Sequence, residues 1–193
     1  MEVPHLRADR HAMGASMKIK DTVIIGLLSS ILFAVQYILQ GVPNIELVSL
    51  LILVYTSILK RKTLFIIAVF VLLEGFFYGF GIWFIGYLYI WFILYFIGRL
   101  IIRKTPPQEH SSIIWALTSG SFGLCFGAFF ALISFLMGLQ SGGFQGGLNS
   151  ALGYWVSGLT FDIIHGISNF TVALVLFKPV YKVLNRLMKN YYD

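Results

Sequence analysis

Long apolar stretches fill most of the chain, and short polar or basic segments separate them. A helix that crosses a bilayer needs about 20 predominantly apolar residues, so stretches of this length predict membrane spans. We therefore expect an all-α integral membrane protein with six transmembrane helices. The predicted spans cover residues 21–39, 46–59, 63–80, 82–102, 112–137 and 150–177.

The second predicted span is the shortest. A helix over residues 46–59 would be roughly 21 Å long at 1.5 Å per residue, less than the hydrocarbon thickness, and we expect a recess at its outer end. Between the last two spans, residues 138–147 are rich in glycine. Glycine accepts backbone angles that other residues resist, so we expect this segment to be a flexible loop and a candidate lid.

The basic residues separate the apolar stretches. Residues 21–59, 63–98 and 105–177 contain no Lys or Arg. Basic loops therefore alternate with base-free turns, and the loops of membrane proteins that are rich in Lys and Arg lie on the cytoplasmic side. Both termini are predicted to be cytoplasmic. The basic clusters are Lys18/Lys20, Lys60/Arg61/Lys62, Arg99/Arg103/Lys104 and Lys178/Lys182/Arg186/Lys189.

The composition agrees with a membrane protein. Apolar residues make up 58% of the chain and charged residues 11%, whereas soluble domains carry about 25% charged residues. The net charge of +6 is explained by bases at the cytoplasmic rim, where they meet anionic lipid headgroups, and does not require a nucleic-acid partner. Cys125 is the single cysteine, so no disulfide framework is expected.

Residues 1–16 differ from the rest of the sequence. They mix His, Arg, Asp and Pro and contain no apolar run, so they fit neither a signal peptide nor a span. We expect them to be a leader added for expression, ahead of a native start at Met17. Residues 17–193 would then form a single transmembrane domain.

Four ionisable residues, Glu46, Glu74, Asp162 and His165, lie inside or at the ends of predicted spans. Each costs on the order of 2.5 to 3.5 kcal/mol at a helix centre, so each needs a reason to be there. Asp162, His165 and Asn169 are three and four residues apart and therefore share one helix face. That face binds a ligand or forms a polar clamp between helices, and the sequence leaves both readings open.

Glu74 and Tyr78 lie one helical turn apart in the outer half of the third span, and they are candidate ligand contacts. The alternative for Glu74 is a structural pair with a polar neighbour. Glu46 begins the second span, where a carboxylate beside the helix N-terminus is stabilised without any ligand. Tyr154 and Trp155 follow the glycine-rich segment and could line the mouth of a pocket, or belong to the interfacial belt of aromatic residues.

Gly26, Ser30 and Ala34 are spaced four apart in the first span, so they lie on one stripe that another helix could approach closely. The last span contains the segment Phe161-Asp162-Ile163-Ile164-His165-Gly166-Ile167-Ser168-Asn169-Phe170. In this segment, in the stripe and in its six spans, the chain resembles the substrate-binding S components of energy-coupling factor (ECF) vitamin transporters. Members of that family commonly carry Ala-x-x-x-Ala on the first helix, whereas this chain has Gly26-x-x-x-Ser30-x-x-x-Ala34.

The resemblance implies a non-enzymatic protein of the bacterial plasma membrane that captures a small vitamin or vitamin precursor from outside. Its partners would be a transmembrane scaffold subunit, which the stripe Gly26, Ser30 and Ala34 would contact, and two ATPase subunits. No cofactor is expected. The chain lacks a glycine-rich nucleotide-binding loop followed by Lys, so ATP would be supplied by the partners. The expected substrate-binding residues are Glu74, Tyr78, Trp155, Asp162, His165 and Asn169.

Two other classes of protein remain. His165-x-x-x-Asn169 is also similar to the final motif of CAAX-type intramembrane proteases, but those enzymes need a paired Glu-Glu and a second histidine, and His165 is the only histidine within the predicted spans. A membrane scaffold without a ligand is the other alternative, and in it Asp162 would serve folding. The sequence does not choose the ligand.

Overall fold

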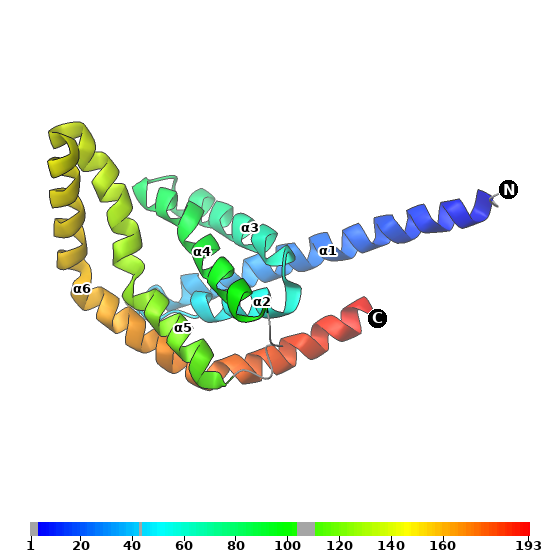
Figure 1. Cartoon of the computed structure of the whole chain (residues 1–193). Helices are drawn as coiled ribbons and strands as arrows, with labels where there is room; N and C mark the ends of the chain where they lie inside the picture. The colour runs from blue at the N-terminus through cyan, green and yellow to red at the C-terminus, as the bar shows by residue number, and fades with distance from the viewer. Residues whose placement is uncertain (1–3, 43, 104–110) are drawn as a thin grey trace.

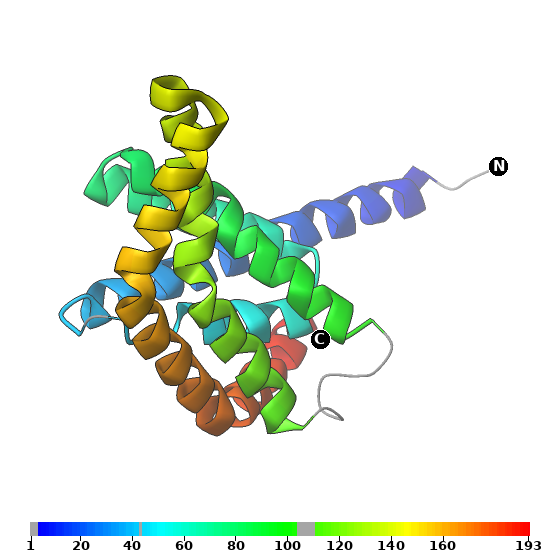
Figure 2. The same cartoon turned by 60° about the vertical axis from the view of Figure 1, so that its left-hand side comes forward.

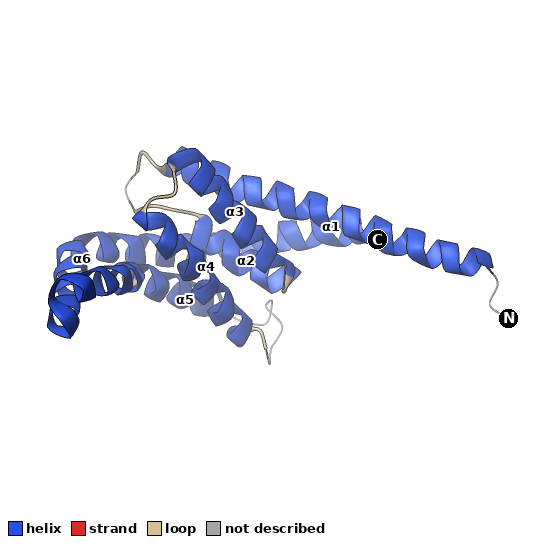
Figure 3. Ribbon diagram, turned by 90° about the horizontal axis from the view of Figure 1, so that it is seen from above, coloured by secondary structure: helices blue, strands red, loops and turns tan. Residues whose placement is uncertain are grey.

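The computed structural model describes residues 4–42, 44–103 and 111–193, with side chains described from Ile19 onward. Lys104, which belongs to one of the predicted cytoplasmic basic clusters, lies outside this part. The described residues are helical and contain no strand (Figures 1 and 3). The helices are α1 (Pro4–Leu39), α2 (Val48–Leu59), α3 (Lys62–Tyr78), α4 (Ile82–Ile101), α5 (Ser112–Leu124) and α6 (Phe126–Tyr192).

Helix α2 lies at the centre of the bundle, in contact with every other helix. All its residues are apolar or small and polar, and from Val48 to Ser57 every one of them is buried. A helix that is apolar on all sides has to be covered on all sides, which explains its position. At 12 residues it is only about 18 Å long, so its neighbours extend beyond its N-terminus.

Helix α5 and the first part of α6 pair with the later part of α6 as a long antiparallel hairpin, whose tip projects from the rest of the molecule (Figure 2). Glycines allow the two limbs to approach. A Cβ on Gly123 would lie 2.8 Å from the His165 carbonyl oxygen, and one on Gly138 would lie 2.5 Å from the Gly146 carbonyl oxygen. Such distances leave no room for a side chain, so the hairpin depends on these glycines.

The hairpin corrects two predicted boundaries. The expected span over 112–137 is interrupted at Cys125 and then continues in α6, and the expected loop over 138–147 is helical except at Gly142 and Gly143. Gly143 has φ 59° and ψ −154°, a conformation that glycine adopts without steric cost. Two residues are enough to reverse the chain because the flanking glycines pack inside the hairpin.

The ends of the chain also differ from the predicted boundaries. Helix α1 begins at Pro4, so the segment expected to be a leader is largely helical and continuous with the first span. Proline is well tolerated in the first turn of a helix, and residues 5–16 contain no breaker except one glycine. Helix α6 continues through Pro179 to Tyr192 and bends more than once along its length (Figure 1). A proline removes one helical hydrogen bond, which favours a bend in the part near Pro179.

Among the described residues, three helices are long and apolar enough to cross a membrane, and they cover Ile19–Leu39, Ile82–Ile101 and Ser112–Tyr192. At most a third of the apolar window in each is buried inside the protein. Large apolar side chains such as Val23, Leu27 and Phe96 are exposed on these helices. Apolar faces of this extent fit a lipid environment, so the chain is a membrane protein.

The basic ends of several helices meet at the end of the bundle where both chain termini lie (Figure 1). Lys62 Nζ lies 2.6 Å from Asp21 Oδ1 and 3.1 Å from the Tyr192 hydroxyl, which in turn donates to Asp21. Lys20 Nζ donates to the Tyr191 carbonyl at 3.0 Å. The C-terminal part of α6 is therefore fastened to the middle of α1 and to the beginning of α3.

Candidate functional site

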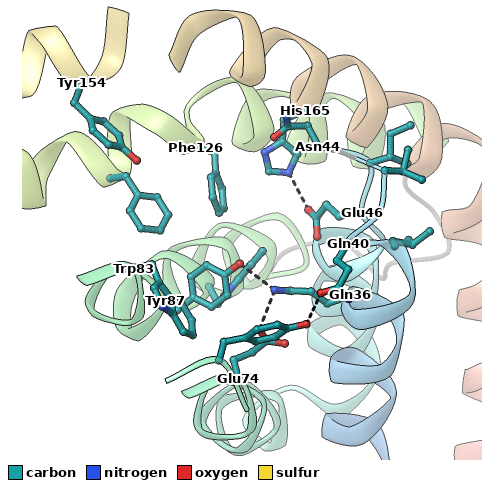
Figure 4. A pocket seen from close by; sticks show the side chains of 16 residues that line it. Gln36, Gln40, Asn44, Glu46, Glu74, Trp83, Tyr87, Phe126, Tyr154 and His165 are labelled. Carbon is teal, nitrogen blue, oxygen red and sulfur yellow. Dashed lines mark hydrogen bonds and ion pairs between the residues drawn. The ribbon is translucent and has the colours of Figure 1, made fainter. Parts of the chain in front are cut away.

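A cavity of about 550 Å³ lies at the opposite end of the bundle, next to the N-terminus of α2. The end of α1, the segment before α2, the end of α3, the first half of α4 and α6 all line it (Figure 4). This is the recess predicted from the shortness of the second span. Its volume is within the range of about 300–1,000 Å³ that is typical of sites for small molecules.

Glu46 organises a buried polar cluster on one side of the cavity (Figure 4). One of its carboxylate oxygens, Oε1, lies 3.2 Å from His165 Nε2 and accepts from Asn169 Nδ2 at 3.1 Å. The backbone N–H and the hydroxyl of Ser49 also donate to this carboxylate. The predicted role of Glu46 at the start of α2 is confirmed by the Ser49 bond, and the carboxylate additionally joins α2 to α6.

Glu74 forms a second polar cluster on the facing side of the cavity. The side-chain amide of Gln36 donates to Glu74 Oε2 and to the Tyr87 hydroxyl, both at 3.1 Å. The Tyr78 hydroxyl donates to Gln40 Oε1 at 2.8 Å. Glu74 is only 1% exposed, and its second oxygen, Oε1, has no hydrogen-bond partner within the described part of the chain. Buried polar atoms are normally paired, so this oxygen requires a donor.

Aromatic rings complete the wall. Tyr87 lies edge-on to Trp83 and to Trp91, with ring centroids 5.3 and 5.4 Å apart. Phe126 and Phe130 of α6 form a second pair at 5.4 Å. The cavity thus combines flat apolar surfaces with a few polar groups at fixed positions, which is the usual composition of a site for a small organic ligand.

Three of the predicted site residues, Glu74, Tyr78 and His165, line the cavity. Asn169 does not reach the cavity, and it lies behind Glu46 as a hydrogen-bond donor. Three of these four predicted residues therefore share one cavity, and Asn169 contacts it only through Glu46, so their role in binding a substrate stays a prediction.

The other two expected substrate-binding residues, Asp162 and Trp155, do not line this cavity. Asp162 is buried, faces the other limb of the hairpin and accepts from the Gly127 backbone N–H at 2.9 Å. This contact joins the two limbs, as in the helix-clamp alternative, and it leaves Asp162 Oδ2 without a hydrogen-bond partner among the described residues. Trp155 is 39% exposed and does not line the cavity, whereas its neighbour Tyr154 does. Adjacent helical positions point about 100° apart, so only one of the two can face inward.

Sequence reasoning missed several residues of the site. Glu46 is predicted mainly as a cap of the second span, and Gln36, Gln40 and Asn44 are not among the expected substrate-binding residues, although all four line the cavity. The detectable signal was their position. All lie on either side of the turn that precedes the short second span, where a recess was expected.

The stripe of Gly26, Ser30 and Ala34 lies on the outside of the bundle, with all its members exposed. A Cβ on Gly26 would meet no atom within 4 Å. The Ser30 hydroxyl is satisfied by the Gly26 carbonyl at 2.9 Å. The stripe is therefore not used for packing within this chain.

Within the described residues, no group of three or more His, Cys, Asp or Glu side chains is arranged to hold a metal ion. No protein-family model matches the chain, and no curated protein and no solved structure matches it either. The function has to be argued from the site.

Proposed function

We propose that this chain is a membrane-embedded substrate-binding subunit, an S component of an ECF-type transporter, that captures a small vitamin-like molecule. The observation that carries the proposal is the cavity beside α2, where Glu74, whose buried Oε1 has no hydrogen-bond partner among the described residues, lies beside a set of aromatic rings. An unpaired buried acceptor costs about 1–3 kcal/mol of stability. A protein that only holds partners together gains nothing in return for this cost, whereas a ligand-binding protein can pair the acceptor with its ligand.

The arrangement of charge supports a location of the cavity at the outer face of a bacterial plasma membrane. The bases that cluster in the sequence, such as Lys20 and Lys62, lie at the other end of the bundle, together with both termini. Positive residues favour the cytoplasmic side. Helices α1 to α4 run alternately towards and away from the cavity end, and the two limbs of the hairpin continue this alternation as the fifth and sixth segments. This alternation supports six membrane crossings.

Native mass spectrometry of the detergent-purified protein tests the proposal. We expect a small molecule to be released on denaturation, and the same compound to raise the melting temperature of the ligand-free protein, since a ligand that binds only the folded state stabilises it. Replacing Tyr154 with Ala should weaken binding about two- to tenfold, the contribution of one aromatic contact. Trp155→Ala is the matched control and should leave binding unchanged, because Trp155 does not line the cavity.

A protein without a bound molecule that is stabilised by no compound of a vitamin panel contradicts this proposal. It would favour the membrane scaffold instead.

The exposed stripe of α1 supports docking to a transmembrane scaffold subunit. We expect Gly26→Leu to abolish co-purification with the scaffold and ATPase subunits from the native host, because close helix approach requires small residues. The isolated variant should melt at or slightly above the wild-type temperature, since leucine is the better helix former and no described atom outside the helix's own backbone lies within 4 Å of the new Cβ. Gly153→Leu, at another open position, is the control and should still assemble. Normal assembly of Gly26→Leu would show that the docking face lies elsewhere.

A further inference from the structure

Two carboxylates line the cavity, and no Lys or Arg of the described residues does. Glu46 and Glu74 both line it, and the other ionisable lining groups among the described residues are His165 and the tyrosines. The described Lys and Arg clusters belong to the opposite end of the bundle, where Lys62 is already paired with Asp21. An anionic molecule would enter this cavity against two carboxylates without any described Lys or Arg to compensate them.

The two carboxylates are not equivalent. Glu46 already interacts with Ser49, His165 and Asn169, so its hydrogen-bonding capacity is met by groups of the protein. Glu74 receives one donor, from Gln36, and its Oε1 has no partner within the described residues although the side chain is 1% exposed. A donor or a cation that approaches such a carboxylate stabilises it.

The surrounding rings favour the same kind of ligand. Trp83 and Tyr87 stand next to Glu74 in the cavity (Figure 4), and Trp and Tyr faces attract cations through the ring quadrupole. A flat ring that carries positive charge can stack on these side chains and direct an N–H group to Glu74.

From this geometry we infer that the ligand is a positively charged heteroaromatic compound, attracted at its cationic or N–H edge by the Glu74 carboxylate beside the cavity. The inference rests on the proposed binding function and narrows it to a substrate class. It excludes carboxylate- and phosphate-bearing compounds as the physiological cargo.

The test is a thermal-shift and affinity panel on the ligand-free wild-type protein, sorted by net charge. The cations are thiamine and 1-methylnicotinamide, the neutral compounds are nicotinamide, pyridoxine and riboflavin, and the anions are nicotinate, biotin and pantothenate, together with any molecule identified after purification. We expect cations alone to stabilise the protein. The sharpest comparison is 1-methylnicotinamide with nicotinamide and nicotinate, because these three share one ring and differ in charge.

Glu74→Gln removes the charge and keeps the shape. We expect it to weaken binding of the stabilising cation at least about tenfold, since hydrogen bonds to charged groups contribute about 1.5–3 kcal/mol. Asp21→Asn is the matched control: it removes an equal charge at the basic end, outside the cavity, and should leave the affinity unchanged.

The outcomes separate the two proposals. Binding of an anion or of a neutral compound as tight as that of its cationic partner, or unchanged cation affinity in folded Glu74→Gln, overturns the charge inference and leaves the binding function standing. Absence of any stabilising compound and of any co-purified molecule overturns the binding function itself. If Glu74→Gln does not fold, the charge-sorted panel on the wild-type protein still decides the inference.

Discussion

Replacing Glu46 with Ala is expected to lower the stability of the folded protein by about 3 kcal/mol, because it leaves buried hydrogen-bond donors without an acceptor, at about 1–3 kcal/mol for each. The substitution leaves His165 Nε2, Asn169 Nδ2 and the Ser49 N–H without their common acceptor. The His165 side chain is only 7% exposed, so water cannot replace the carboxylate freely. The measurement is the melting temperature in detergent, with an expected decrease of about 6–12 °C.

Glu46→Gln is the matched control for this prediction. The amide keeps one oxygen that can accept from Ser49 or Asn169 and fills the same volume, so a smaller decrease is expected, about 1 kcal/mol for a weakened neutral hydrogen bond. Both variants should also bind the ligand more weakly, because Glu46 lines the cavity. Wild-type stability of the Ala variant would show that the Glu46 cluster does not connect α2 to α6.

The boundaries of α3 and α4 were well predicted because the sequence marks them twice. A basic cluster marks one end of each helix, and the glycines around residue 80 mark the other. The observed helices, Lys62–Tyr78 and Ile82–Ile101, differ from the predicted spans by one or two residues. Charge and turn chemistry are local properties, so they can be recognised without knowledge of the neighbours.

The hairpin could not be predicted from local properties. Its glycines indicate a loop when they are taken alone, but Gly138 and Gly147 are helical and face the opposite limb, where a Cβ would lie 2.5 Å from the Gly146 oxygen and 2.8 Å from the Phe135 ring. A glycine that breaks a helix and one that allows two helices to approach are identical in sequence. Only the partner surface distinguishes them.

The same limitation explains the errors at the site. The spacing of Asp162, His165 and Asn169 correctly indicates one polar face, and Glu74 and His165 were found because ionisable groups in apolar spans need a reason. The spacing does not reveal what each residue meets along that face. Asp162 meets the Gly127 backbone, whereas His165 and Asn169, further along the helix, meet Glu46. The contact with Glu46, at the start of a distant helix, decides which part of the face lies at the cavity.

Gly123→Ala is the second substitution for which a large effect is expected. It should destabilise the protein, although helix propensity alone favours alanine over glycine. A Cβ at this position would lie 2.8 Å from the His165 carbonyl oxygen, 2.9 Å from its carbon and 3.0 Å from the Gly166 Cα. These are backbone atoms of the facing limb, so they cannot move without displacing the helix. Overpacking of this kind costs about 1–3 kcal/mol, and we expect a lower melting temperature.

Gly153→Ala provides the control for that experiment, because its Cβ would meet nothing within 4 Å. The same change should stabilise the helix there by up to about 1 kcal/mol, since alanine is the better helix former. Melting temperatures that shift in opposite directions would show that close packing at Gly123 holds the hairpin together. A shift upwards in both variants would contradict the packing seen between the limbs.

The affinity for ligand should fall only in Gly123→Ala. A displaced facing limb moves His165 away from Glu46 and so shifts one wall of the cavity.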